Sequence, residues 1–338
     1  MKVVCVYGKE DLAITEYERP VCRPGHAVVR MEMCGVCGSD VTAYRGSNPT
    51  VKYPIEGIGH EGVGEIVEIM DPDNNLSVGD RVALEPYVPC GECPMCLQGR
   101  FNNCENLKVC GVHKNGMMAE YFLHPVSLLH RIPDTLSYRD ACLVEPFTIG
   151  LHAITRAQVK KDDYCVVFGA GTIGLLAALG IKLYGGKPVL VDVIESRLNF
   201  AREVGIEATI NSMNEDVAAR LREISGGRLP NVMIECTGSQ AVLRNIHEYV
   251  AHGANVALVG WPHDLVPLNQ VRLMQKEVTI YTSRNSNSKF PESMGYIADG
   301  LIPVDSIITS NTDLDGLEDV IRDMIVNPDK YLKVVAKI

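Results

Sequence analysis

Residues 164–186 read YCVVFGAGTIGLLAALGIKLYGG, an apolar run followed by a glycine-rich turn and a long apolar stretch. The run is typical of a buried strand and the stretch of a helix. In a strand–turn–helix of this kind the first glycine permits the tight turn, the second lets a pyrophosphate approach the backbone, and the third lets the helix lie close to the strand. We therefore expect a dinucleotide at Gly169, Gly171, Thr172, Ile173 and Gly174.

The next apolar run, KPVLVDVI (187–194), favours NAD as that dinucleotide. It places Asp192 18 residues after Gly174. An acidic side chain there can accept hydrogen bonds from the ribose hydroxyls and repels a 2′-phosphate. Arg197 would soften this preference, and Thr237 is a further candidate contact. The alternative is a purely structural glycine turn with a solvent-facing aspartate.

The character of the sequence changes near residue 147. Before it, short apolar runs such as VVRMEMCGV (28–36), broken by Gly, Pro and Asp, are typical of a mostly β domain. From 148 to 289 strands alternate with helices, which implies a parallel α/β sheet. Residues 290–338 hold one helix and a final apolar strand, which either extend the α/β unit or return to the first domain.

Composition limits the classes of partner. The chain has 338 residues, a net charge of −10 and 12 cysteines. The negative charge disfavours nucleic acid and acidic membrane surfaces and favours a small molecule. No apolar run reaches the ~20 residues that span a bilayer, and we expect no export signal. A reducing cytoplasm is therefore expected, where clustered cysteines usually mean metal or catalysis.

The segment CGECPMCLQGRFNNC (90–104) has the spacing of a metal-binding loop. Four thiolates close in sequence can enclose one tetrahedral zinc with no open position and couple the folding of the loop to metal binding. An iron–sulfur cluster or free thiols are the alternatives. Zinc is favoured because the loop has little apolar content. The expected ligands of this structural site are Cys90, Cys93, Cys96 and Cys104.

A second metal site is predicted from three separate segments. GIGHEGVGE (57–65) surrounds His60 and Glu61 with glycines, which weaken a plain strand. Cys37 lies upstream of it and Glu145 downstream. A catalytic zinc usually has about three protein ligands and an open position. A flexible turn that happens to carry two polar residues is the alternative for the His-Glu pair.

In this order, CGVCGSD, GHEGVGE, the four-cysteine loop and GAGTIG resemble the zinc-dependent medium-chain alcohol dehydrogenases over essentially the whole chain. The resemblance implies an α/β protein with a GroES-like, mostly β catalytic domain (1–147, completed by 290–338) and a doubly wound Rossmann NAD domain (148–289). It implies NAD and two zinc ions as cofactors. It also implies a homodimer or homotetramer joined through the strand EVTIYTS (277–283).

The resemblance assigns roles to the second metal site. Cys37 and His60 match the first two zinc ligands, and Glu61 matches an adjacent glutamate that coordinates the metal in some members. Ethanol-type members have a cysteine where this chain has Glu145, and EPFTIGLHA (145–153) is similar to the sorbitol dehydrogenase and polyol branch. There that glutamate binds the zinc or its water. Cys34 corresponds to a core position.

The same resemblance implies proton and hydride transfer. Ser39 is placed to pass the alcohol proton outward while the hydride goes to the nicotinamide. Two carboxylates and a thiolate would make the metal less positive than a histidine-rich site does. We therefore expect weaker acidification of the alcohol and an alkaline pH optimum for oxidation.

Three stretches narrow the substrate. AYRGSNPTVKYP (43–54), EPFTIG and SRNSNSKFP (283–291) resemble bacterial L-galactonate and L-gulonate 5-dehydrogenases. Arg284 matches an arginine near the substrate in polyol dehydrogenases, and its planar fork suits a carboxylate or hydroxyls. Candidate substrate contacts are Tyr44, Arg284, Asn285 and Lys289, each with a solvated surface residue as the alternative. His152 is a cofactor contact or a core histidine.

Other functions stay open. The sequence is also compatible with a sorbitol, xylitol or sugar-phosphate polyol dehydrogenase and, more distantly, a threonine dehydrogenase. A redox sensor without turnover and a zinc-free quinone reductase are disfavoured, because the expected ligands and Ser39 are all present.

Overall fold

The computed structural model describes residues 1–48, 50–71 and 74–338, so Pro49 of the stretch 43–54 lies outside the described residues. The chain divides into two compact units. Unit 1 comprises Met1–Glu145 and Phe290–Ile338, and unit 2 comprises Pro146–Lys289. Unit 1 thus ends at Glu145, against the expected boundary at residue 147. Helix α4 (Val144–Arg156) runs across this boundary, so no loop marks it.

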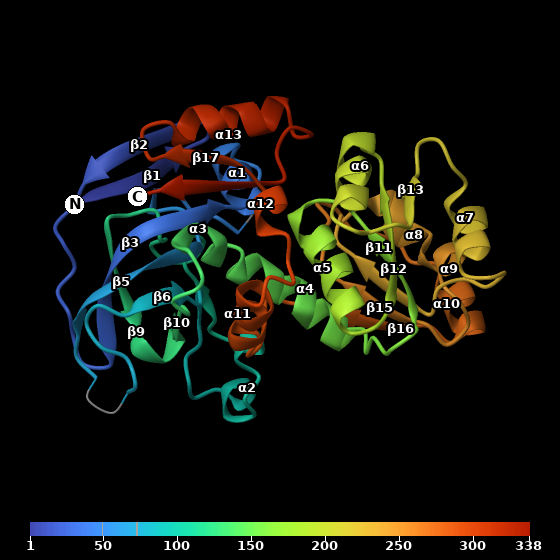
Figure 1. Ribbon diagram of the computed structural model, residues 1–338, viewed down its shortest axis with the longest axis horizontal. Helices are drawn as coiled ribbons and strands as arrows, with labels where there is room; N and C mark the ends of the chain where they lie inside the picture. The colour runs from blue at the N-terminus through green and yellow to red at the C-terminus, as the bar shows by residue number, and fades with distance from the viewer. Residues whose placement is uncertain (49, 72–73) are drawn as a thin grey trace. The chain divides into compact units, whose positions relative to one another are not determined.

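Unit 1 is built around a seven-stranded sheet (Figure 1). Six strands lie in the order β10-β6-β5-β3-β18-β17, and β9 also pairs with β3. The long strand β3 pairs antiparallel with β5, β9 and β18. The bounds are β3 (His26–Val36), β5 (Glu61–Ile69), β6 (Arg81–Leu84), β9 (Tyr121–Pro125), β10 (Leu129–Arg131), β17 (Ile308–Asp313) and β18 (Lys333–Lys337).

Smaller elements complete unit 1. A three-stranded sheet has the order β2-β1-β4, and β7 pairs with β8. The strands are β1 (Lys2–Gly8), β2 (Asp11–Glu16), β4 (Ile55–Glu56), β7 (Tyr87–Val88) and β8 (Lys108–Val109). The helices are α1 (Gly38–Tyr44), α2 (Pro94–Leu97), α3 (Tyr138–Ala141), α11 (Phe290–Ala298), α12 (Val304–Ile307) and α13 (Leu317–Val326), with 3-10 turns at Phe101–Asn103 and Val126–Leu128.

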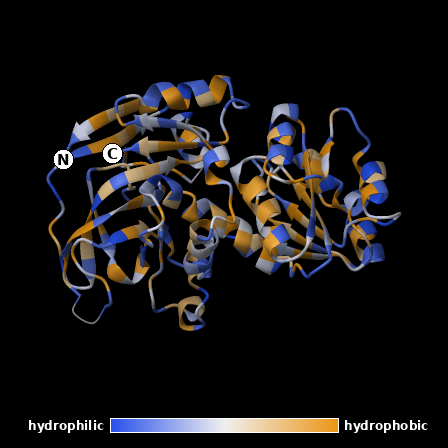
Figure 2. Ribbon diagram, in the orientation of Figure 1, coloured by the Kyte–Doolittle hydropathy of each residue, from blue (hydrophilic) through white to orange (hydrophobic). Residues whose placement is uncertain are grey.

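The core of unit 1 lies where α1 and α13 cover the strands. In Figure 2 α13 alternates hydrophobic and hydrophilic residues, as expected for a helix with one buried face. Its Leu317 and Ile321 are buried in one cluster with Val29, Ile66 and Tyr44. The final strand β18 inserts between β3 and β17, so the tail returns to the first unit. It holds three helices and two strands, where the sequence predicted one of each.

Unit 2 is a six-stranded parallel sheet in the order β13-β12-β11-β14-β15-β16. This order places the first strand of the unit, β11, at the centre and is that of a doubly wound dinucleotide fold. The strands are β11 (Tyr164–Phe168), β12 (Lys187–Asp192), β13 (Thr209–Asn211), β14 (Val232–Glu235), β15 (Asn255–Leu258) and β16 (Thr279–Thr282). The central strands are almost continuously buried, because helices cover a parallel sheet on both faces.

The helices of unit 2 alternate with these strands, as the sequence predicts. After α4, most of which belongs to unit 2, they are α5 (Thr172–Leu183), α6 (Glu195–Glu203), α7 (Val217–Ile224), α8 (Gln240–Arg244), α9 (Ile246–Tyr249) and α10 (Gln270–Lys276). α5 follows the glycine turn directly and has eight buried residues, from Gly174 to Ile181. It therefore fixes the turn against the sheet.

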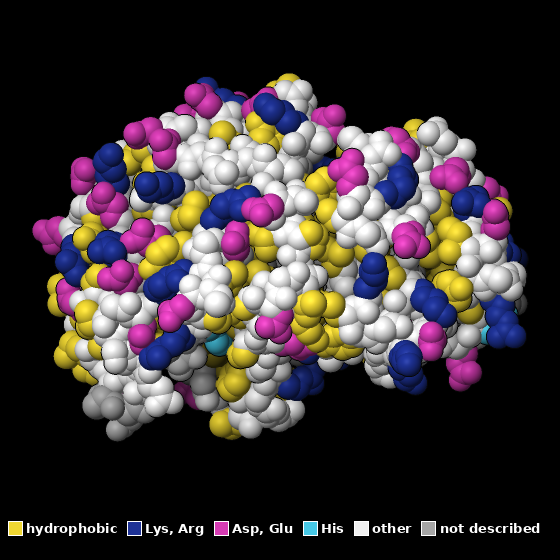
Figure 3. Space-filling view, in the orientation of Figure 1, with side chains coloured by type: hydrophobic (Ala, Val, Ile, Leu, Met, Phe, Trp, Pro, Cys, Tyr) yellow, Lys and Arg dark blue, Asp and Glu magenta, His cyan; other side chains and the backbone are white. Residues whose placement is uncertain are grey.

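Charged side chains of both signs cover the face of the molecule that Figure 3 shows. Lysine and arginine side chains are interspersed there with aspartate and glutamate. Among the described residues, none of the helices has the length and apolar character needed to cross a membrane.

Candidate active site

The first part of the site is the beginning of α1. Cys37 is the N-cap of this helix, and its backbone N–H donates to Asp40 Oδ2 at 2.9 Å. The other oxygen of Asp40 accepts from the backbone N–H of Gly59 at 3.1 Å. One buried carboxylate therefore ties the turn that carries Cys37 to the turn that carries His60. Ser39, which lies between Cys37 and Asp40 in the sequence, has a buried Oγ with no hydrogen-bond partner among the described residues.

The glycines around His60 have a physical cause. Gly59 has a φ of +84°, a conformation that side chains rarely adopt, and a Cβ there would lie 2.8 Å from Cys34 Sγ. Cys34 itself is buried in the core of unit 1. The chain must turn tightly over this sulfur before β5 begins at Glu61. The glycines thus allow His60 and Glu61 to be placed close to Cys37.

The donor set fits a metal ion. Ligand atoms of Cys37, His60 and Glu61 all lie within 4.8 Å of one another, and His60 and Glu61 are buried. Burial lowers the pKa of His60, but the Cys37 thiolate, Asp40 and Glu145 raise it by more, so the net shift is well upward. The site attracts a cation, and the buried His60 Nδ1 has no partner among the described residues. Thiolate, imidazole and carboxylate together suit zinc.

Glu145 lies near this group without belonging to it. It is buried at the start of α4 and accepts a hydrogen bond from the hydroxyl of Tyr87, a residue that the sequence reasoning missed. Burial raises the pKa of Glu145 to about 7, with His60 opposing and Glu61 reinforcing the shift. Tyr87 thus orients this buried carboxylate beside the Cys37, His60 and Glu61 group.

Lys333 is the second residue that the sequence reasoning missed. It lies on β18, and its Nζ donates to both oxygens of Glu61, at 2.6 and 2.7 Å, inside the protein. The available signal was a lysine within the apolar strand YLKVVAKI (331–338), because a charged side chain in a buried strand needs a partner. Its positive charge offsets one of the two carboxylates on which the expected alkaline pH optimum depends.

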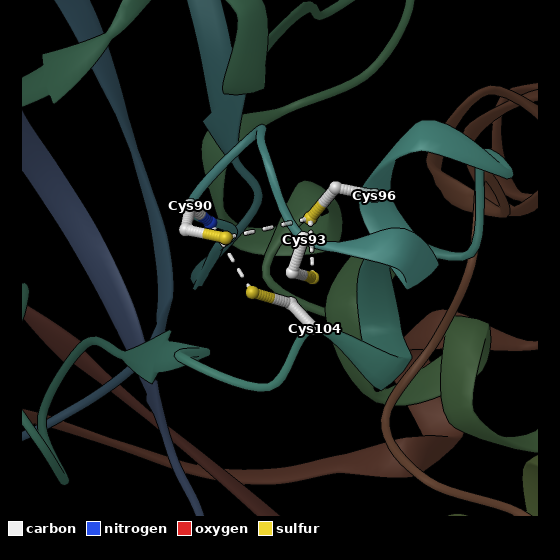
Figure 4. A group of neighbouring side chains, drawn as sticks. All are labelled: Cys90, Cys93, Cys96 and Cys104. Atoms are coloured by element: carbon white, nitrogen blue, oxygen red, sulfur yellow. Dashed lines mark hydrogen bonds between the residues drawn. The ribbon is translucent and has the colours of Figure 1, made fainter.

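The four-cysteine loop forms a separate cluster (Figure 4). The four sulfur atoms point toward one another and lie within 4.8 Å. Cys93 Sγ is 3.6 Å from Cys96 Sγ, and Cys104 Sγ accepts from the backbone N–H of Cys90 at 3.2 Å. The backbone N–H groups of Glu105 and Cys96 lower the pKa of Cys93 to about 6. Four converging sulfurs without an open position suit a structural zinc.

The glycine turn of unit 2 has the geometry that a dinucleotide requires. A Cβ at Gly174 would lie 1.8 Å from the carbonyl oxygen of Gly169, whereas one at Gly171 would meet nothing within 4 Å. Gly174 is therefore needed for the close approach of α5 to the turn. Gly171 leaves open space beside the helix N-terminus, where phosphates bind. Thr172 and Ile173 are the first two residues of α5.

Asp192 has a structural role beyond the one predicted from the sequence. Its Oδ2 accepts from the backbone N–H of Ala170 at 2.5 Å, and its Oδ1 from that of Ile194 at 2.9 Å. It ends β12, and Arg197 follows on α6. The carboxylate thus fixes the glycine turn, and each oxygen retains a lone pair for a ribose hydroxyl.

Thr237 approaches the glycine turn from the neighbouring strand. A Cβ at Gly169 would lie 2.9 Å from Thr237 Cγ2. The buried carboxylate of Glu235, which sequence reasoning missed, accepts from the backbone N–H and hydroxyl of Thr237 and from the N–H of Gly238. His152 is buried in α4, and burial lowers its pKa to about 4.

The candidate substrate residues differ in their surroundings. Arg284 is exposed, Asn285 is half-buried with a φ of +52°, and Lys289 Nζ lies 3.5 Å from the hydroxyl of Tyr184. Tyr44 is only 1% exposed, and its hydroxyl donates to Glu318 and accepts from Arg322 on α13. Its side chain belongs to the core of unit 1, so its prediction as a substrate contact is wrong.

A zinc ion held by Cys37 and His60 would supply a Lewis acid for an alcohol oxygen. Residues around the zinc would supply a proton carrier and would orient the two carboxylates of the site. Ser39 Oγ is an unused hydroxyl for moving a proton, Tyr87 orients Glu145, and Lys333 restrains Glu61. In unit 2 the glycine turn and Asp192 would hold NAD, which accepts the hydride.

Comparison with known proteins agrees with this geometry. Residues 23–134 match the family model "Alcohol dehydrogenase GroES-like domain", and residues 172–299 match "Zinc-binding dehydrogenase". An uncharacterized zinc-type alcohol dehydrogenase-like protein of Haemophilus influenzae is 39% identical over 99% of this chain and 98% of its own length. L-galactonate-5-dehydrogenase of Escherichia coli is 32% identical, with 99% and 98% covered, and sorbitol dehydrogenase of Bacillus subtilis is 29% identical, with 99% and 96% covered.

A solved structure supports the cofactor. The alcohol dehydrogenase RspB of E. coli CFT073, complexed with NADH, superposes with a TM-score of 0.94 at 31% identity, covering 100% of this chain and 99% of that one. The predicted fold class, family, NAD and zinc cofactors are therefore confirmed. The chain belongs to the zinc-dependent medium-chain alcohol dehydrogenases, in the polyol dehydrogenase branch, and is an NAD-dependent enzyme that acts on a small alcohol.

Proposed function

We propose that the protein oxidises a secondary alcohol of a sugar acid or polyol to the ketone with NAD, as an L-galactonate or L-gulonate 5-dehydrogenase would. The observation that carries this proposal is the segment Ser283–Lys289. Ser283 Oγ, Asn285 Nδ2 and Ser286 Oγ are buried there without a hydrogen-bond partner among the described residues, next to the exposed guanidinium of Arg284. Buried polar groups of this kind cost free energy unless a ligand satisfies them.

The chemistry of the segment matches that of a sugar acid. A guanidinium binds a carboxylate through two parallel hydrogen bonds. Hydroxyl and amide groups pair with the hydroxyls of a polyol chain. The relative named L-galactonate-5-dehydrogenase supports the same class of substrate. The relative named sorbitol dehydrogenase favours the alternative, a neutral or phosphorylated polyol.

The roles of the residues in unit 1 follow from their contacts. Cys37, His60 and Glu61 would hold the catalytic zinc, and Ser39 Oγ would relay the alcohol proton outward, accepting it as its own hydroxyl proton passes on to water. Glu145, with a pKa of about 7 and a hydrogen bond from Tyr87, would serve as the polar neighbour of the reacting oxygen. The four-cysteine loop would hold the structural zinc.

Arg284 provides the test of substrate class. Charge-assisted pairing to a carboxylate contributes about 1.5–3 kcal/mol, or roughly ten- to a hundredfold in binding. Arg284→Ala should therefore raise the KM for a sugar acid by about that factor and affect a neutral polyol much less. The quantity to measure is the ratio of kcat/KM for L-galactonate or L-gulonate to that for sorbitol, by NADH absorbance.

Lys289→Ala is the matched variant, because it removes the other candidate cation of the segment. If neither substitution changes the ratio, the substrate is a neutral polyol. A protein that binds NADH but oxidises none of a panel of sugar acids, polyols and polyol phosphates would support the redox-sensor alternative instead.

We also propose a homodimer or homotetramer formed through unit 2. In the described part of the chain β16 pairs only with β15, so its other edge is open to a strand of a second copy. The segment between β15 and β16 in the chain carries exposed apolar side chains at Trp261, Leu265, Val271 and Met274. Trp261→Glu with Met274→Glu should dissociate the assembly in light scattering, and Leu97→Glu, an exposed leucine of unit 1, should not. A wild-type monomer at micromolar concentration would contradict the proposal.

The proposed location is the cytoplasm. All twelve cysteines lie within the described residues as free thiols, and two groups of them are arranged as metal ligands. Clustered cysteines that stay reduced are typical of a reducing compartment. Cell fractionation of the native host checks this.

A further inference from the structure

The carboxylate of Glu235 is buried in unit 2 without a cationic partner. Glu235 is the last residue of β14 and is 0% exposed. It accepts from the backbone N–H of Thr237 at 2.8 Å, from the hydroxyl of Thr237, and from the backbone N–H of Gly238 at 3.0 and 3.1 Å. In the described part of the chain no lysine, arginine or histidine forms an ion pair with it. Its hydrogen bonds are therefore complete, whereas its charge has no counterpart.

The hydrogen-bond pattern is that of an ionised carboxylate, which can only accept. The hydroxyl of Thr237 accepts from the backbone N–H of Ser239 at 2.9 Å, so its own proton is directed to Glu235. Buried charges are normally paired with an opposite charge or bound to a metal. Glu235 belongs to neither group of possible metal ligands among the described residues. The missing counterpart is therefore a cation that comes from outside the chain.

The position of Glu235 in the sheet indicates which cation this is. β14 pairs in parallel with β11, and Glu235 lies opposite Phe168, the residue before Gly169. A Cβ at Gly169 would lie 2.9 Å from Thr237 Cγ2, so the turn after β14 packs against the glycine turn. The carbonyl oxygen of Glu235 also accepts from the N–H of Gly260, just after β15, at 2.9 Å. The turns after three neighbouring strands therefore meet around this residue.

A dinucleotide binds across this edge of a doubly wound sheet, with one nucleotide on each side of the central switch point. Asp192 at the end of β12 serves the adenosine ribose, which places the adenosine over the half of the sheet formed by β11, β12 and β13. The nicotinamide nucleotide then belongs to the ends of β14, β15 and β16, where Glu235 lies. The oxidised nicotinamide ring carries a positive charge, and the reduced ring is neutral.

We propose that Glu235 determines the redox preference of the cofactor site: its buried negative charge favours the cationic ring of NAD⁺ over the neutral ring of NADH. The proposal rests on the assignment of the cofactor to the glycine turn and is independent of which alcohol is the substrate. The other role for Glu235 is a structural one, in which the carboxylate only holds the turn of Thr237 and Gly238 in shape.

Glu235→Gln separates the two roles because it removes the charge and keeps the shape. Oε1 alone accepts from both N–H groups and the hydroxyl of the turn, so the amide oxygen of glutamine can replace it. The ratio of the dissociation constant for NAD⁺ to that for NADH should then rise by about tenfold, the order expected for loss of a unit charge in a partly buried site. A purely structural carboxylate would change both constants by the same factor and leave the ratio unchanged.

The measurement uses the full chain, with NADH binding followed by fluorescence, NAD⁺ binding by calorimetry, and folding checked by circular dichroism. Three variants that keep the charge of Glu235 serve as controls. Glu203→Gln removes an exposed carboxylate of α6 and should leave both constants unchanged. Thr237→Val removes one donor to Glu235 and should change both constants by the same factor. Glu235→Asp should keep the ratio within about twofold of the wild type, since the carboxylate remains.

An unchanged ratio in folded Glu235→Gln overturns the proposal, as does a tenfold rise of the ratio in Thr237→Val. Should Glu235→Gln not fold, Glu235→Asp decides: a ratio within twofold of the wild type supports the role of the charge, and a tenfold rise refutes it. If Gly171→Ala leaves both constants unchanged, the cofactor does not bind at the glycine turn, and the proposal fails together with that assignment.

Discussion

At the scale of single residues, buried charges are satisfied one by one. Asp40 accepts from two backbone N–H groups, Glu61 is paired with Lys333, and Glu235 accepts from the turn that follows it. Each arrangement meets the requirement that a buried carboxylate must be hydrogen-bonded or paired. The carboxylates therefore hold the metal site and the cofactor site in shape as well as carrying charge.

The buried side chain of His124 should make the free energy of unfolding depend on pH. Its Nε2 lies 2.9 Å from the carbonyl oxygen of Glu85, so Nε2 carries the proton, and its buried Nδ1 has no partner among the described residues. Burial lowers its pKa to about 3. The unfolded chain, with a histidine pKa of about 6.5, therefore binds more protons between these values. The free energy of unfolding should fall as pH falls through this window, by up to about 1.4 kcal/mol per pH unit.

His124→Gln removes this titration and keeps a side-chain N–H for the Glu85 carbonyl. The difference in unfolding free energy between wild type and variant, from urea melts at pH 4.5 to 7, should therefore shrink or reverse as the pH is lowered. An identical slope for both proteins would show that His124 is not neutral in the fold.

Asp192 links the shape of the glycine turn to cofactor choice. Asp192→Ala should weaken NADH binding by about tenfold, because it removes both the ribose acceptor and the support of Ala170, and should relax the exclusion of NADPH. Asp192→Asn removes the charge and keeps one acceptor oxygen, so it should affect NADH less. Dissociation constants from NADH and NADPH fluorescence measure both effects. Glu203→Ala, an exposed carboxylate on α6, is the control, and a wild type that prefers NADPH would contradict this reading.

At the scale of elements, what could be predicted from the sequence was what is local. The strand, turn and helix of 164–186 and the four-cysteine loop each lie within about 25 residues, and their spacing alone defines them. Contacts across the chain could not be predicted in this way. Lys333 and Glu61 are 272 residues apart, and Tyr44 is oriented by Glu318 and Arg322 on a helix from the far end of the chain. The resemblance of residues 43–54 to a substrate-binding segment therefore gave the wrong prediction that Tyr44 contacts the substrate.

The glycine turn allows fold and cofactor binding to be separated. Gly174→Ala places a Cβ 1.8 Å from the Gly169 carbonyl, and neither backbone can yield, so Tm and NADH affinity should both fall. Gly171→Ala meets no protein atom within 4 Å but occupies the space beside the phosphates. It should therefore keep the wild-type Tm and lose NADH affinity. Thermal melts with and without NADH measure both quantities.

Gly295→Ala is the control for the loss of a helical glycine. It lies within α11, and a Cβ there meets nothing within 4 Å, so Tm should stay constant or rise, by the equivalent of about 0.5–1 kcal/mol. If the Gly171→Ala protein binds NADH as tightly as the wild type, the glycine turn is not part of the cofactor site.

At the scale of the whole molecule, the chain builds one unit from both ends and the other from the middle. Unit 1 is left at Glu145 and re-entered at Phe290, and β18 then joins the sheet that carries Glu61. At the re-entry Phe290 stacks on the ring of His130, and Ser293 Oγ donates to the carbonyl of Val144 at 2.8 Å. The last strand thus places Lys333 beside Glu61 of the metal site. The alternating strands and helices of residues 148–289 give no indication of this contact.

Unit 1 also contains both metal sites, and their different geometries predict different behaviour toward a chelator. Four sulfurs enclose the structural site completely, whereas Cys37 and His60 leave a position open. The purified protein should contain two zinc ions per chain. Mild chelation should remove one of them together with all dehydrogenase activity, and added zinc should restore it.

His60→Ala should contain one zinc, stay folded and be inactive. Cys104→Ser should lose the other zinc and unfold at a lower temperature, because metal binding and folding of the loop are coupled. Metal analysis by mass spectrometry, with circular dichroism and NADH production on the same samples, measures all three quantities. Fully active protein with no more than one zinc per chain would contradict the two-site assignment, as would loss of the four-cysteine zinc before activity declines.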